Sequence, residues 1–278
     1  MLAYRHYFHA GNFADVFKHA LLVRLLLALA RKDKPFCYLD THAGIGRYDL
    51  NHRWAQKNRE YEGGIARIWQ RTDIPELLVP YLEVLRAENP DGALRTYPGS
   101  PAIAQRLLRD ADRMVLCELN EKDKEALRQG FARERRAGVH LIDGFQAVKA
   151  FLPPRERRGL MLMDPSFDRK GEYARVGEAL REAHQRFATG VMVFWYPLME
   201  PAAVRRFEAD VRDSGVPKIL QLELWLHPAD WAASLRGCGM LVVNPPFGFE
   251  DEARALLPWL VEALGSRGAS GQRARALG

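Results

Sequence analysis

A short apolar segment that ends in an acidic residue and continues into a glycine loop constrains this fold more than any other stretch. Residues 36–40 read Phe-Cys-Tyr-Leu-Asp, and residues 41–46 read Thr-His-Ala-Gly-Ile-Gly. A continuous apolar run of this length is typical of a buried strand in a parallel sheet. Open α/β sheets bind ligands at the carboxyl ends of their strands, where glycines let the backbone approach the ligand. We therefore expect a strand that leads into a binding loop, although an ordinary strand and turn would look the same in isolation.

Strands and helices alternate through most of the chain. A helix is expected over 15–32 before the first strand, with Lys18 and His19 in its first turn. Further strands are expected at 113–118, 139–142, 160–163 and 191–196, each followed by a helix, and a closing strand pair at 218–226 and 239–243. Together with 36–40 these strands predict an α/β protein with a mostly parallel, seven-stranded sheet and helices on both faces.

One segment interrupts this alternation and defines the domain organisation. Residues 47–97 carry helical patterns at 61–71 and 75–88, which predicts a small helical insertion. We assign residues 1–46 and 98–264 to the α/β domain. Ser100 is the expected N-cap of the helix that follows the insertion, with Pro101 at its first position. The tail over 265–278 is rich in Gly, Ser, Ala and Arg, and we expect it to be mobile.

Composition narrows the class of protein. The chain has 278 residues, with 41 Lys and Arg against 35 Asp and Glu, which gives a net charge of +6. This charge favours a polyanionic partner such as nucleic acid, although a basic enzyme without such a partner would have the same composition. The three cysteines lack metal-type spacing, so we expect reduced core residues and no zinc. The apolar run at 21–30 is too short to span a bilayer, and we predict a cytoplasmic protein without export signal or anchor.

Acidic residues end four successive predicted strands: Asp40, Glu118, Asp143 and Asp164. Glycine spacing does not match the G-x-G-x-x-G pattern, which disfavours a nicotinamide dehydrogenase. A carboxylate at Glu118 can accept both ribose hydroxyls, and Asp143 can accept an adenine amine. The N–H groups at the start of the Ser100 helix suit a carboxylate. The groups that these residues could bind, namely ribose, adenine and a carboxylate, are the parts of S-adenosylmethionine. Each acid taken singly could instead be a cap or a surface residue.

The sequence Asp164-Pro165-Ser166-Phe167 is the candidate for chemistry. N6 of adenine is a poor nucleophile because its lone pair is delocalised into the ring. A carboxylate from Asp164 and the carbonyl of Pro165 can accept its hydrogens and free that lone pair, while Phe167 stacks on an extruded base. Asn-Pro-Pro-Phe at 244–247 fits the amino-methyltransferase pattern better by letters, but it follows the last strand, and we favour Asp164.

With these residues assembled, the chain resembles the RlmJ family of bacterial 23S ribosomal RNA adenine-N6 methyltransferases over about residues 1 to 260. The resemblance is carried by Tyr-Arg-His at 4–6, His-Ala-Gly-Asn at 9–12, Leu-Asp-Thr-His-Ala-Gly at 39–44, Tyr-Pro-Gly-Ser-Pro at 97–101 and Trp-Tyr-Pro at 195–197. It implies a Rossmann-like class I fold that uses S-adenosylmethionine, acts on 23S ribosomal RNA as a monomer, and needs neither metal nor membrane.

The resemblance also implies roles for individual residues. The cofactor pocket would comprise His19, His42, Ser100, Glu118, Asp143, Gly144 and Asp164, with Lys18 beside it. Asp164 would orient the amine, with Pro165 and Phe167 completing the catalytic loop, and Tyr4 would touch the RNA. The family pattern Asp-Pro-Pro-Tyr becomes Asp-Pro-Ser-Phe here, so Ser166 removes the rigidity of a second proline. We expect an active enzyme with a looser loop. A DNA adenine methyltransferase, and a non-catalytic RNA-binding protein inactivated through Ser166, remain alternatives.

Overall fold

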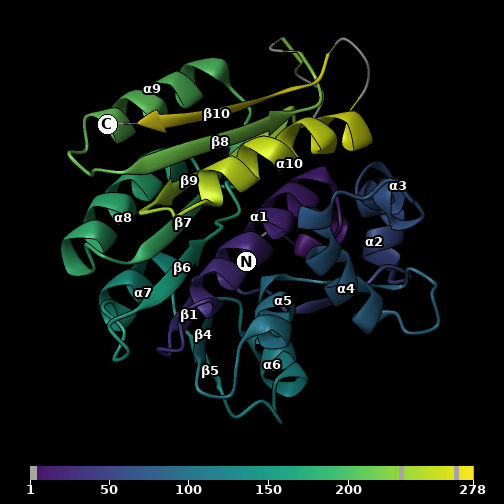
Figure 1. Ribbon diagram of the computed structural model, residues 1–278, viewed down its shortest axis with the longest axis horizontal. Helices are drawn as coiled ribbons and strands as arrows, with labels where there is room; N and C mark the ends of the chain where they lie inside the picture. Colours follow the sequence, from purple (N-terminus) through teal and green to yellow (C-terminus); the bar gives the residue numbers. More distant parts are fainter. Residues whose placement is uncertain (1–4, 229, 232–234, 266–268, 278) are drawn as a thin grey trace.

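The computed structural model describes residues 5–228, 230–231, 235–265 and 269–277. Its centre is a twisted sheet with helices on both faces (Figure 1). The strands are β1 (Cys37–Asp40), β4 (Arg113–Glu118), β5 (Ala137–Leu141), β6 (Gly159–Met163), β7 (Val191–Leu198), β8 (Ile219–Trp225), β9 (Gly237–Val243) and β10 (Gly271–Leu277). Across the sheet they follow the order β10-β8-β9-β7-β6-β1-β4-β5.

The topology is that of a doubly wound nucleotide-binding sheet. Strands β5, β4, β1, β6 and β7 pair in parallel, and the chain reverses direction across the sheet between β1 and β6. Strand β9 then inserts antiparallel between β7 and β8. This arrangement confirms the α/β, Rossmann-like class I methyltransferase fold with its mostly parallel sheet. The sheet has eight strands among the described residues, one more than the seven expected.

Both faces of the sheet are buried, which explains the continuous apolar runs in its strands. In β1 the side chain of Tyr38 enters one core, whereas Cys37 and Leu39 enter the other. The first core is covered by α1 (Phe13–Ala30), α5 (Ser100–Leu107), α6 (Glu121–Gly130) and α10 (Phe249–Leu264). The second is covered by α7 (Gly144–Phe151), α8 (Glu172–Arg186) and α9 (Pro201–Arg212). These two helical layers flank the sheet in Figure 1.

The segment between β1 and α5 is mainly helical and returns close to its starting point. It contains β2 (Arg47–Asp49), α2 (Arg53–Asn58), η2 (Glu60–Gly63), α3 (Ile65–Trp69), η3 (Glu76–Leu78), α4 (Val79–Glu88) and β3 (Thr96–Pro98). Strands β2 and β3 pair antiparallel, so the two ends of the segment lie together. Helix α5 can therefore take the place beside β1 that a directly connected helix would occupy.

The carboxyl-terminal residues differ from the sequence expectation. Residues 271–277, expected to be part of a mobile tail, form the edge strand β10 and pair antiparallel with β8. Two arginines of β10 reach acidic groups: Arg273 lies 3.1 Å from Glu223 of β8, and Arg275 lies 3.1 Å from Glu208 of α9. The composition of the tail did not indicate a strand, because the acidic partners of its arginines lie on β8 and α9, far away in the sequence.

Helix α1 begins two residues earlier than expected from the sequence. The side chain of Asn12 caps it by accepting a hydrogen bond from the Asp15 amide at 2.9 Å. Lys18 and His19 consequently lie in the second turn, where both are buried. Within the described ranges, no helix combines the length and apolar character needed to cross a membrane.

Candidate active site

A cavity lies at the carboxyl edge of the sheet, where β1, β4, β5 and β6 end. Its lining includes every residue expected to contact the cofactor: Lys18, His19, His42, Ser100, Glu118, Asp143, Gly144 and Asp164. The structure thus brings these side chains to one place. Their convergence follows from the parallel strands, whose carboxyl ends share one edge of the sheet.

Asp40 ends β1, directly before the cavity residues Thr41 and His42. Its buried carboxylate accepts hydrogen bonds from the hydroxyls of Tyr38 at 2.8 Å and Ser100 at 2.7 Å. Burial raises the pKa of Asp40 to about 6, although the two hydroxyl donors oppose the shift. The expectation that Ser100 caps α5 is wrong: Gly99 is the N-cap, because the Ser100 hydroxyl donates to Asp40 instead. This bond joins the start of α5 to the end of β1.

Glu118 ends β4 and holds the glycine loop that follows β1. One of its oxygens accepts the Gly44 amide at 3.0 Å, and the other accepts the Asn120 amide at 2.7 Å. Burial raises the pKa of Glu118. Gly44 has φ +59°, and a Cβ there would lie 2.3 Å from the Tyr48 hydroxyl oxygen, so glycine is required. The carboxylate borders the cavity, and each oxygen keeps a second lone pair for a ligand.

Asp143 and Gly144 form the start of α7 and pack directly against the β1 loop. Asp143 is the N-cap: one oxygen accepts the amides of Phe145 at 2.8 Å and Gln146 at 3.4 Å. Its other oxygen lies 3.5 Å from Arg175. Asp143 is therefore both a cap and a cavity residue, and in the described part of the chain its second oxygen accepts no backbone amide.

Two neutral histidines complete this cavity. Burial lowers the pKa of His42 to about 4, and its Nδ1 lies 2.8 Å from the Thr41 hydroxyl. Burial, together with the nearby Lys18 charge, also lowers the pKa of His19 well below its ordinary value. His19 Nδ1 contacts the Tyr97 hydroxyl at 2.8 Å, but its Nε2 is buried without a hydrogen-bond partner in the described part of the chain. His19 thus brings an unsatisfied polar atom to the cavity.

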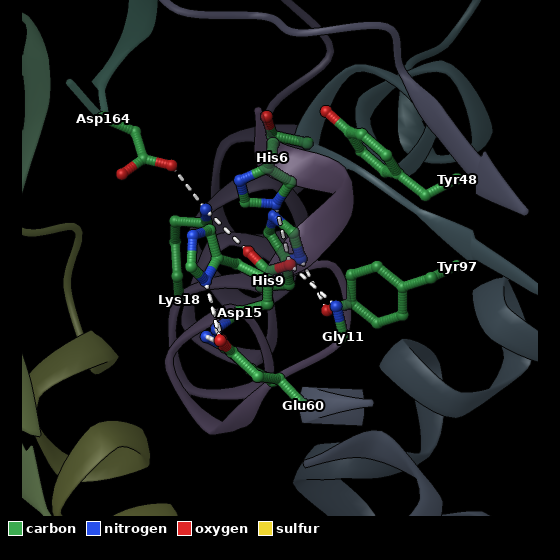
Figure 2. Close-up of polar contacts among 12 residues, drawn as sticks. His6, His9, Gly11, Asp15, Lys18, Tyr48, Glu60, Tyr97 and Asp164 are labelled. Carbon is green, nitrogen blue, oxygen red and sulfur yellow. Dashed lines mark hydrogen bonds and ion pairs between the residues drawn. The ribbon is translucent and has the colours of Figure 1, made fainter. Parts of the chain in front are cut away.

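A second cavity of about 620 Å³ adjoins the first, and Asp164, Pro165, Ser166 and Lys18 line both. Lys18 is buried and donates to Asp164 and, at 2.9 Å, to Asp15 (Figure 2). Burial opposes its charge, but the two carboxylates raise the pKa of Lys18 above its ordinary value. A permanently charged lysine therefore stands against the carboxylate that separates the two cavities.

Phe167 borders only the second cavity, together with Trp195. Its backbone has φ +53°, a left-handed conformation that is uncommon outside glycine. Its ring lies 5.9 Å from that of Trp195 and 4.9 Å from that of Tyr173, measured between centroids. Asp164 and Phe167 thus present a carboxylate and an aromatic ring to the same space.

The alternative motif at 244–247 lies at the opposite edge of the sheet. The Asn244 side-chain amide donates to the carbonyls of Ala188 at 2.8 Å and Gly190 at 2.9 Å, just before β7 begins. Phe247 is 98% exposed. Asn244 terminates β9 and contributes to neither cavity.

Sequence reasoning missed one buried group and named another that falls outside the described residues. Asp15, treated as the start of α1, is a buried carboxylate paired with Lys18; the signal was its i, i+3 spacing from that lysine. Tyr4 lies outside the described residues. The three cysteines are free and buried. Among the residues that the structure describes, no cluster of three or more His, Cys, Asp or Glu could hold a metal ion.

Comparison with known proteins places this chain in a family. The family model described as "Ribosomal RNA large subunit methyltransferase D, RlmJ" matches residues 33–276. Ribosomal RNA large subunit methyltransferase J of Escherichia coli K12 is 46% identical over 264 residues, 95% of this chain and 94% of the relative. The protein of the same name from Haemophilus influenzae is 43% identical over 265 residues, with the same coverage.

Solved structures agree on the fold. A crystal structure of a Legionella pneumophila protein, 38% identical, has a TM-score of 0.90 and covers 96% of this chain and 98% of its own. A probable spermidine synthase from Corynebacterium glutamicum, at 10% identity and a TM-score of 0.51, shares the fold alone, over 94% of this chain and 75% of its own. By the family match and the two curated relatives, the chain belongs to the RlmJ family of ribosomal RNA large subunit methyltransferases.

Proposed function

We propose that this protein transfers a methyl group from S-adenosylmethionine to N6 of an adenine in 23S ribosomal RNA. The observation that carries the proposal is the position of Asp164 and Pro165 on the wall between two cavities. One cavity is lined by the residues expected for the cofactor, and the other has aromatic walls suited to a base. Both curated relatives are named as methyltransferases of large-subunit ribosomal RNA.

The donor and acceptor groups of the first cavity fit S-adenosylmethionine. Glu118 and Asp143 supply carboxylate oxygens for ribose hydroxyls and for the adenine amine. The start of α5 and the unpartnered Nε2 of His19 supply polar groups for the amino-acid end. Gly144 lets α7 approach the β1 loop closely. When bound there, S-adenosylmethionine would supply an electrophilic methyl group.

The residues between the cavities can activate an amine. Lys18 occupies one oxygen of Asp164, and no other hydrogen bond to this carboxylate occurs in the described ranges, which leaves its second oxygen for an amine hydrogen. The Pro165 carbonyl accepts a hydrogen bond from the other amine hydrogen. With both hydrogens bonded in this way, the lone pair stays on the nitrogen instead of being delocalised into the ring, and the nitrogen becomes nucleophilic. Phe167 and Trp195 hold the extruded base by stacking. After transfer, the Asp164 carboxylate can accept the amine proton.

We further infer that the enzyme works as a monomer in the cytoplasm. The described residues of a single chain line both cavities, which supports a monomer. Ribosomal RNA as substrate places the reaction where ribosomes are assembled.

The test is methylation of 23S ribosomal RNA transcripts by purified protein, followed by nuclease digestion and mass spectrometry of the nucleosides. Wild type should yield N6-methyladenosine, and Asp164→Ala should lower the rate by about a hundredfold or more because the amine loses its side-chain acceptor. Asp210→Asn, at an exposed position of α9, is the control and should match wild type. Thermal melting verifies that both variants fold. Methylation of duplex DNA in preference to RNA, or wild-type activity in Asp164→Ala, would contradict the proposal.

A further inference from the structure

We propose that Asp15 is a positioning residue, which holds the Lys18 ammonium against Asp164 and thereby fixes the orientation of that carboxylate. The inference rests on the proposed function, because it assigns Asp164 to the amine. Asp15 does not contact Asp164; it contacts Lys18, which in turn contacts Asp164. It would therefore act through the lysine.

Asp15 is itself held in place on every side. Its side chain is 2% exposed, and its Oδ2 accepts the Gly11 amide at 2.9 Å and lies 2.9 Å from His6 Nε2. Its Oδ1 lies 2.9 Å from Lys18 Nζ (Figure 2). The His6 and Lys18 charges lower the pKa of Asp15 well below its ordinary value, although burial opposes them. The result is a rigid, charged acceptor one turn before Lys18 on α1.

Lys18 needs such an acceptor because its own side chain is flexible. A lysine ammonium on a four-carbon stem has many rotamers, and it is strongly attracted to whichever carboxylate it can reach. Between two carboxylates its position is defined, so Asp164 meets a fixed donor. With Asp15 uncharged, Lys18 would be attracted to Asp164 alone, and the pair could move together into the space used by the base. A displacement of about 1 Å in a reacting group can lower a rate by about a hundredfold.

The loop that carries the partners of Asp15 is supported by the inserted segment. His9 and Asn12 both contact Glu60 of η2 at 3.0 Å. The Ile65 amide of α3 donates to the Gly11 carbonyl at 2.8 Å. The insertion thus fixes the start of α1, and through it the acceptor that restrains Lys18. No contact between the insertion and the reacting groups is needed for this effect.

A merely structural role would be that Asp15 holds the start of α1, through the Gly11 amide and His6, and so stabilises the fold independently of Lys18. The two roles differ in how Asp15 and Lys18 combine. If Asp15 acts through Lys18, the loss of both side chains costs no more activity than the loss of Lys18 alone. If Asp15 only stabilises the fold, its loss lowers the melting temperature and the active fraction whether or not Lys18 is present.

The experiment is a double-mutant cycle with Asp15→Asn and Lys18→Met, assayed for kcat and KM on 23S RNA. Asp15→Asn should lower kcat by about tenfold to a hundredfold with KM unchanged, and should add no further loss in the Lys18→Met background. Glu252→Gln is the matched control, because Glu252 pairs with Arg24 at 2.8 Å and Arg31 at 2.7 Å at the other end of α1. This control should leave kcat unchanged.

A crystal structure of Asp15→Asn gives a readout besides activity, and should show Lys18 Nζ displaced from its position in the wild type. Wild-type kcat in Asp15→Asn, equal losses in both Lys18 backgrounds, or an undisplaced Lys18 would each overturn the inference. If wild type does not methylate RNA at all, the proposed function fails instead, and the crystal structure still decides whether Asp15 positions Lys18.

Discussion

Gly144 is a position at which one added methyl group tests the cofactor cavity. A Cβ built there would lie 2.4 Å from the Thr41 carbonyl oxygen and 2.4 Å from His42 Cε1. Neither contact can be relieved by a flexible side chain, because the first atom is backbone and the second belongs to a rigid ring that the Thr41 hydroxyl contacts at 2.8 Å. In Gly144→Ala the start of α7 must therefore move away from the β1 loop.

The size of the effect follows from these distances. Ordinary van der Waals contact begins at 3.4 Å, so a contact at 2.4 Å requires a separation of about 1 Å. Overpacking of this kind costs about 1–3 kcal/mol. The shift falls on Asp143 and His42, two groups that line the cavity. If the bound state must restore the original spacing, the dissociation constant rises about tenfold to a hundredfold, since each 1.4 kcal/mol is about tenfold.

Isothermal titration calorimetry with S-adenosylhomocysteine measures this constant directly. Gly177→Ala is the matched control, because Gly177 lies within α8 and a Cβ there meets no atom within 4 Å. Alanine in a helix is more stable than glycine by about 0.5–1 kcal/mol, so this control should raise the melting temperature slightly and bind like wild type. Wild-type affinity in Gly144→Ala would refute the placement of the cofactor in the cavity that Asp143, Gly144 and His42 line.

Three further predictions concern charge, stacking and salt. Because burial raises the Asp40 pKa from 3.8 to about 6, the folded state binds this proton more tightly, and roughly 3 kcal/mol of stability present below pH 3.8 is lost as the pH rises through 6. In Asp40→Asn the free energy of unfolding, measured by urea denaturation, should depend less on pH in this range. An unchanged pH dependence would argue against a raised pKa at Asp40. Phe167→Ala should lower kcat/KM for RNA by about tenfold to a hundredfold through lost stacking, while Phe167→Tyr should retain it; equal rates in both variants would remove Phe167 from the base site. Affinity for 23S RNA, measured by filter binding, should fall steeply with salt because Lys and Arg contacts to phosphate release counterions, and a flat response would exclude such contacts.

The cavity was predictable because its residues are marked by local patterns. Glu118 and Asp164 each follow a buried apolar run, Asp143 follows the half-buried edge strand β5, and a polar residue directly after such a strand lies at its carboxyl end. Parallel pairing then brings these ends together without further information from the sequence. The same reasoning separated Asp164 from the motif at Asn244, since β9 runs antiparallel and ends at the other edge.

The rest depended on tertiary partners that no local pattern reveals. Ser100 has the sequence context of an N-cap, but a buried carboxylate at Asp40 takes its hydroxyl. Residues 271–277 look like a polar tail until β8 and α9 supply acidic partners for their arginines. Asp15 reads as a helix-start residue, and only the approach of Asp164 from β6 shows that Lys18 is shared between two carboxylates. In each case the structure was determined by an ion pair, a hydrogen bond or a strand partner distant in the sequence, which local sequence propensity does not predict.

The most direct measurement is mass spectrometry of 23S ribosomal RNA from cells that carry or lack the gene for this protein. We expect one adenine to carry an N6-methyl group in the first RNA and to lack it in the second, with restoration by the wild-type gene and not by Asp164→Ala. Identical adenine methylation in the two RNAs would contradict the assignment of Asp164 and its two cavities to methyl transfer.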